Sequence, residues 1–335
     1  MSWQALRTGF RNFSQRWLMV FGSAFILLFF SEYFFVNEGP GQAIVDRLAD
    51  NRLSILPHIL EFGAYYALFA YVLHLTLAHY RVSSINGLFL AGVLFGWATE
   101  AVIVPIVYES IPVSFIFPSV GWHALVDVLL GWYIVRWVMR QNRWWASLLM
   151  FAALGAVWGA WATWVWVDPE ITQILTPAEF RGFAFVTASV WLAGMLLLDA
   201  VGQTPFTPGR WEVRIVIGVI LLLAAGMGFL YLPFSLLILL PLWLTLWALR
   251  RMSRRPQETD LLEPLMMTEP AWWNYPLVVL TPLVAAGIYP MFYASGTGIP
   301  TEDVTFLLFM VGTVWLLVAW VRPFLSRGRS SVIDT

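Results

Sequence analysis

Two adjacent apolar runs decide how this chain must fold. Residues Ile215–Leu232 read IVIGVILLLAAGMGFLYL and, after Pro233, residues Phe234–Leu249 read FSLLILLPLWLTLWAL, with no aspartate, glutamate, histidine or arginine in either run. A helix of roughly 20 apolar residues crosses a hydrocarbon core that is ~30 Å thick. The pair therefore reads either as two membrane-spanning helices joined by a turn or as one long, broken helix.

The rest of the chain has the composition of a membrane protein. Of its 335 residues, 60% are hydrophobic and 12% are charged, and the mean hydropathy is +0.74. Soluble domains carry about twice this share of charge. We therefore predict an all-α, polytopic transmembrane helix bundle with ten spans, at Trp17–Phe35, His58–Ala78, Ile85–Tyr108, Gly121–Met139, Trp144–Val167, Phe183–Val201, Ile215–Leu232, Phe234–Leu249, Tyr275–Tyr293 and Val304–Val321.

The distribution of arginine favours ten spans over nine. All 19 basic residues are arginine, and arginine is enriched in cytoplasmic loops because it resists translocation. With ten spans and a cytoplasmic N-terminus, only Arg47, Arg52 and Arg181 lie outside, which leaves the other 16 inside. Nine spans would move Arg322 and the basic tail to the outer side. We therefore predict cytoplasmic N- and C-termini and a multi-pass protein of the cell inner (plasma) membrane.

The composition also excludes several kinds of chemistry. The chain has no lysine and no cysteine. It therefore lacks the residues for a retinal or pyridoxal Schiff base, a P-loop, a disulfide, a cysteine-ligated cluster or a cysteine nucleophile. A net charge of −1 gives no reason to expect a nucleic-acid partner. The expected partners are the lipid bilayer, a lipid-like or small-molecule substrate, and other proteins.

The sequence divides into three segments. Residues 1–16 carry Trp3, Leu6 and Phe10 at helical spacing, with Arg7 on the opposite face, which is typical of an interfacial amphipathic helix. Residues 17–201 form a transmembrane bundle with polar residues inside its spans. Residues 202–335 form an apolar transmembrane bundle with a short cytoplasmic tail. Similar His–carboxylate and Trp-Ala-Thr patterns in 58–108 and 121–167 suggest that the first of these hairpins was duplicated.

Five ionisable side chains fall in the outer halves of three consecutive spans. An ionisable group inside a span costs several kcal/mol unless it is paired or faces water, so each is a candidate for a functional site. His-x-x-Glu and His-x-x-x-Asp each place two polar groups on one helix face. The five side chains are those of His58, Glu61, Glu100, His123 and Asp127.

Three functions fit such a set. All five residues are suitable ligands for a divalent metal such as zinc, which would make the protein a metal-dependent hydrolase or transferase on a lipid-like substrate. In that hypothesis Glu61, Glu100 and His123 are catalytic, and the apolar segment 110–120 is a lid. The same carboxylates are equally suited to carry protons in a coupled transporter. The third hypothesis is a non-catalytic subunit of a membrane or pigment complex.

Two further carboxylates fall near the ends of spans. Asp199, near the inner end of the sixth span, is expected to cap a helix or pair with Arg210. Glu32, near the outer end of the first span, is expected to be solvated or to line an entrance. Neither is predicted to belong to the site.

Overall fold

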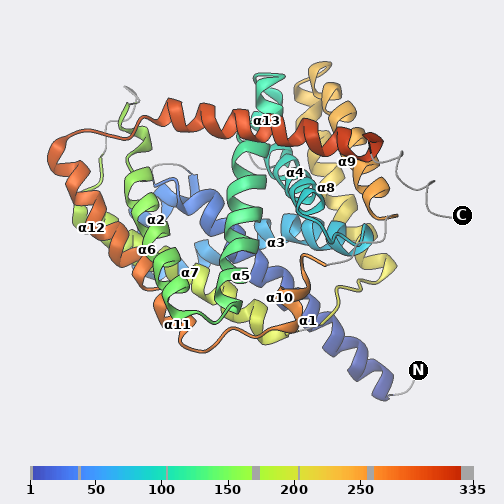
Figure 1. Cartoon of the computed structure of the whole chain (residues 1–335), viewed down its shortest axis with the longest axis horizontal. Helices are drawn as coiled ribbons and strands as arrows, with labels where there is room; N and C mark the ends of the chain where they lie inside the picture. Colours follow the sequence, from blue (N-terminus) through green and yellow to red (C-terminus); the bar gives the residue numbers. More distant parts are fainter. Residues whose placement is uncertain are drawn as a thin grey trace, which may run out of the picture. The chain divides into compact units, whose positions relative to one another are not determined.

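The ten predicted spans are confirmed. The computed structural model describes residues 3–36, 39–102, 105–167, 174–202, 204–254 and 260–325, and all regular structure in this part of the chain is helical. The helices long and apolar enough to cross a membrane (Figure 1) are Arg11–Tyr33, Arg52–His79, Ile85–Val102, Val113–Arg140, Trp144–Trp166, Pro177–Val201, Arg210–Leu230, Phe234–Met252, Asn274–Ser295 and Thr301–Phe324. The chain is therefore a multi-pass membrane protein, and the two runs around Pro233 are separate spans.

The chain folds as two compact units, each assembled from three separate stretches. The first unit comprises Met1–Ala70, Leu130–Pro205 and Pro264–Val304, and the second comprises Tyr71–Leu129, Phe206–Glu263 and Thr305–Thr335. The two units therefore interleave along the sequence. Four helical segments pass from one unit to the other: α3 (Ile55–His79), η5 (Ser119–Ile134) and, at their first residues, α10 (Glu263–Met267) and α13 (Thr301–Leu325).

The first unit packs around aromatic side chains. Its helices are α1 (Trp3–Leu28), α2 (Gly39–Asp50), the first part of α3, α5 (Val135–Arg140), α6 (Trp144–Trp161), α7 (Pro177–Val201), α11 (Asn274–Leu277) and α12 (Leu280–Ser295). Helix α1 packs on α7, and α12 packs on α6 and α7. In the core, the ring of Phe29 stacks on Trp191 at 4.8 Å and meets Trp158 edge-on at 5.0 Å. Such aromatic pairs stabilise a core beyond their area alone.

The second unit is built around α4 (Ile85–Val102). This helix packs on α8 (Arg210–Leu230) and α9 (Leu239–Met252), and the three are seen together in Figure 1. A third partner of α4 is α13 (Thr301–Leu325), whose Trp315 stacks on Phe89 of α4 at 4.8 Å. Of the residues in the membrane-spanning stretch of each helix, 83% are buried in α4 and 17% in α8. The apolar outer face of α8 is therefore suited to lipid, whereas α4 is the interior helix of its unit.

Two segments differ from their predicted form. The predicted interfacial helix 1–16 is not a separate element, because α1 runs without a break from Trp3 to Leu28. The third span ends at Val102 rather than Tyr108. The segment after it forms short 3-10 turns at Pro105–Tyr108 and Val113–Phe115, where prolines interrupt regular helix.

Candidate functional site

The candidate site begins with a close approach of α4 and η5 in the second unit. A Cβ atom at Gly96 would overlap the carbonyl oxygen of Ser119 and lie 2.9 Å from Cβ of His123. A Cβ atom at Gly92 would lie 3.0 Å from Cα of Ala124. Small residues at such an interface let helix backbones approach closely in membranes. Glu100 lies one turn beyond Gly96 on the same face, so it is directed at η5.

The facing helix supplies two polar side chains from one strip of its surface. η5 begins with backbone hydrogen bonds from Gly121 to Ile116 (2.7 Å) and from His123 to Pro118 (3.2 Å), which are the i to i−5 bonds of a π-helix. Such wide turns occur frequently at functional sites. His123 and Asp127 lie four residues apart, and their side chains are hydrogen-bonded to each other.

Glu100, His123 and Asp127 form a hydrogen-bonded chain that we call the Glu–His–Asp triad. Nε2 of His123 lies 2.6 Å from Oε1 of Glu100, and Nδ1 lies 2.7 Å from Oδ2 of Asp127. All three residues are buried, and Asp127 has no exposed surface. The imidazole therefore joins one carboxylate of α4 to another on its own helix.

The proton content of the triad can vary without moving its heavy atoms. An imidazolium donates from both nitrogens, whereas a neutral imidazole donates from one and accepts at the other. With His123 protonated and both carboxylates ionised, the triad carries a net charge of −1, and one more proton neutralises it. Hydrogen bonds to ionised groups in a buried setting are short and strong. The triad is thus chemically equipped to accept, hold and pass on a proton.

The segment between α4 and η5 is hydrogen-bonded to α4. Nε1 of Trp97 donates a 2.8 Å hydrogen bond to the carbonyl of Phe115, and the hydroxyl of buried Ser114 donates to the carbonyl of Val107 at 2.9 Å. The ring of Phe95 meets His123 edge-on at 5.9 Å. The predicted lid segment therefore consists of hydrogen-bonded turns anchored to α4, one turn from Glu100.

His58 and Glu61 belong to the other unit. His58 is buried with its Nε2 3.4 Å from the carbonyl oxygen of Pro40, and its ring lies 4.7 Å from that of Phe62. Glu61 is exposed. The two residues were expected on one face of α3, yet only His58 is turned inward there. Of the five predicted residues, the structure brings Glu100, His123 and Asp127 into mutual contact.

Both ring nitrogens of His123 are engaged by carboxylates in this arrangement. A histidine ligand binds a metal through one ring nitrogen, but both ring nitrogens of His123 are directed at carboxylate oxygens. Among the described residues, no group of three or more histidine, aspartate or glutamate side chains is arranged to hold a metal ion.

Two carboxylates outside the predicted site have partners that sequence reasoning missed. Asp199, which was expected to cap a helix or pair with Arg210, pairs with Arg140 and accepts a 2.9 Å hydrogen bond from the hydroxyl of Tyr275. Glu32 is half-buried rather than solvated and accepts a hydrogen bond from Tyr66. The Arg136-x-x-x-Arg140 spacing, which puts two arginines on one helix face, was the available signal for the first of these clusters.

Comparison with protein-family profiles, with curated protein sequences and with solved structures finds no significant match to this chain.

Proposed function

We propose that this protein is a proton-coupled membrane transporter in which the Glu–His–Asp triad is the proton carrier. The observation that carries the proposal is the buried chain of hydrogen bonds from Glu100 through both nitrogens of His123 to Asp127. A charged side chain at the centre of a membrane helix costs about 2.5–3.5 kcal/mol on insertion scales. A cluster of three such groups is accordingly a marker of proton relays in pumps and transporters.

The triad passes a proton by two coupled transfers. The carboxylic proton of Glu100 moves to Nε2 of His123 as the Nδ1 proton moves to Oδ2 of Asp127. The imidazole is neutral before and after, and the net result is one proton moved from one carboxylate to the other. Among the described residues Oε2 of Glu100 has no hydrogen-bond partner, so this oxygen is our choice for proton entry.

The distribution of arginine sets the orientation of the protein in the membrane for this proposal. The positive-inside rule puts the Val102 end of α4 at the outer face, with both termini cytoplasmic, and thus puts Glu100 near the outside. We place the protein in the plasma membrane on this basis. In this scheme protons enter the triad from the outer side and leave it inward as a solute crosses.

Proton flux into liposomes tests the proposal. Full-length protein is reconstituted with a pH-sensitive dye inside, a potential is imposed with potassium and valinomycin, and solutes are added by class. We expect flux, basal or solute-stimulated, to fall to the level of empty liposomes in Glu100→Gln and Asp127→Asn. The matched control is Glu61→Gln, an exposed carboxylate outside the triad, which should keep wild-type flux. Flux that is equal in all four proteins, or absent from the wild type with every solute class, refutes the proposal.

A further inference from the structure

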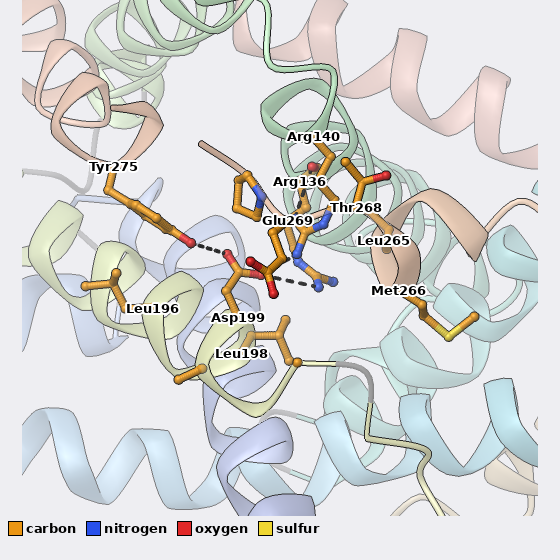
Figure 2. Close-up of a pocket in the computed structure, with 13 residues that line it drawn as sticks. Arg136, Arg140, Leu196, Leu198, Asp199, Leu265, Met266, Thr268, Glu269 and Tyr275 are labelled. Carbon is orange, nitrogen blue, oxygen red and sulfur yellow. Dashed lines mark hydrogen bonds and ion pairs between the residues drawn. The ribbon is translucent and has the colours of Figure 1, made fainter. Parts of the chain in front are cut away.

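A polar cavity of about 350 Å³ lies in the first unit (Figure 2). It is formed by the last turns of α5 and α7, by the first turn of α11 and by the chain that precedes α11. Its polar lining residues are Arg136, Arg140, Asp199, Thr268, Glu269 and Tyr275. None of them belongs to the Glu–His–Asp triad.

The cavity holds two buried guanidinium groups and one buried carboxylate. Arg136 and Arg140 are each 6% exposed. Asp199 pairs with Arg140 through Oδ1, and the same oxygen lies 3.9 Å from a terminal nitrogen of Arg136. Its other oxygen accepts from Tyr275. Both acceptor oxygens of Asp199 are therefore engaged, and Arg136 is left with only a distant counter-ion.

The arginines retain unused donors. Nε of Arg136 and Nε of Arg140 are buried and have no hydrogen-bond partner among the described residues. The remaining contacts of Arg136 and Arg140 are a cation–π contact of Arg136 with the ring of Trp132 at 5.0 Å and a 3.2 Å hydrogen bond from Arg140 to the carbonyl of Arg136. A buried charged donor without an acceptor is costly, so its retention points to an acceptor that binds there.

A second carboxylate stands at the mouth of the cavity. Glu269 is exposed, and Figure 2 shows its side chain beside Asp199, directed toward the arginines. Among the described residues, no ion pair joins it to either arginine. Because it is exposed to solvent, its charge is better screened than that of Asp199. It therefore weakens an anion site here without neutralising it.

We propose that this cavity binds the phosphate group of an anionic ligand between Arg136 and Arg140. A guanidinium is a planar fork of donors that matches phosphate oxygens, and arginine is preferred for such recognition. The hydroxyl of Thr268 lines the same space as a further donor. Leu196 and Met266 line the cavity and are 46% and 47% exposed, so an apolar surface adjoins the phosphate position. The ligand is an anionic phospholipid headgroup or a soluble phosphate.

Binding to the full-length protein in detergent distinguishes these sources. The probes are phosphatidylglycerol, diacylglycerol with the same acyl chains, and inorganic phosphate, with lipid binding followed by native mass spectrometry and phosphate binding by the shift in unfolding midpoint. Arg136→Gln should weaken binding about tenfold to a hundredfold, the loss of one charged hydrogen-bonding partner. Glu269→Gln should strengthen it about two- to fivefold. The control is Arg143→Gln, an exposed arginine outside the cavity, which should bind as the wild type does.

Each outcome decides the proposal. Phosphatidylglycerol binding that depends on Arg136 supports a lipid headgroup, and phosphate binding with the same dependence supports a soluble ligand. Equal binding of phosphatidylglycerol and diacylglycerol without phosphate binding overturns the proposal, as do equal losses in Arg136→Gln and Arg143→Gln. If Arg136→Gln does not fold, Glu269→Gln decides, and unchanged phosphate and lipid binding in that variant overturns the site.

Discussion

Replacing Gly96 with alanine should disconnect the Glu–His–Asp triad without changing any of its residues. The added Cβ would overlap the carbonyl oxygen of Ser119, which is backbone and cannot rotate away, and would lie 2.9 Å from Cβ of His123. Ordinary contact begins near 3.4 Å, so the His123 contact alone demands a shift of about 0.5 Å, and the carbonyl demands more. If α4 and η5 move apart by about 1 Å, the 2.6 Å hydrogen bond between Glu100 and His123 lengthens to about 3.6 Å, which is beyond hydrogen-bond range.

Two effects set the expected loss of unfolding free energy in Gly96→Ala. Overpacking costs about 1–3 kcal/mol, and a lost hydrogen bond to a charged group costs about 1.5–3 kcal/mol. Some of this is recovered by relaxation, so we expect Gly96→Ala to lower the free energy of unfolding by about 2–4 kcal/mol and to reduce proton flux to the level of Glu100→Gln. The assays are reversible unfolding in mixed micelles and the liposome flux measurement.

A graded glycine series controls this experiment. A Cβ atom added at Gly218 of α8 would meet nothing within 4 Å, so Gly218→Ala should leave stability and flux within error of the wild type. Gly92→Ala meets Cα of Ala124 at 3.0 Å and should fall between the two. If Gly96→Ala retains wild-type stability and flux, the packing of α4 on η5 does not position the triad and the reasoning is refuted.

Three further predictions concern the buried charges, the topology and metal binding. Asp199→Asn removes the buried carboxylate that pairs with the two arginines of the cavity and should cost about 3–5 kcal/mol of unfolding free energy, against about 1 kcal/mol for Tyr275→Phe; equal costs would contradict this account. Because the chain has no cysteine, Asp50→Cys should react with an impermeant maleimide in intact cells and Gln141→Cys only after permeabilisation, whereas the reverse pattern would invert the topology. Purified protein should contain no stoichiometric zinc by elemental analysis, and a ratio near one that disappears in His123→Ala would restore the metal-dependent hypothesis.

The spans were predictable because they depend on local sequence. A segment in lipid must satisfy its backbone hydrogen bonds internally, so an apolar run of sufficient length becomes a helix whatever surrounds it. The two runs on either side of Pro233 illustrate this, since the structure has one span on each side of the turn. Two helix ends differ from the prediction. Helix α1 extends back through the amphipathic segment, and α4 ends at Val102, after which turns replace the predicted last part of the span.

The sequence could predict only some of the residues that form the site. His123 and Asp127 are four residues apart on one helix, so their pairing is contained in the sequence. The contact with Glu100 depends on the approach of two helices, for which Gly92-x-x-x-Gly96-x-x-x-Glu100 was an available signal. His58 was grouped with them by predicted depth alone, and it lies instead against the carbonyl of Pro40.

The sequence by itself determined the number of membrane spans, their approximate positions and the residue types available for chemistry. The tertiary structure decided which of these residues meet: Glu100 with His123, and Asp199 with Arg140. The physical reason is that hydropathy measures transfer into lipid, which each helix undergoes alone. The rotation of a helix about its axis and its choice of neighbour depend on side-chain packing between segments far apart in the chain.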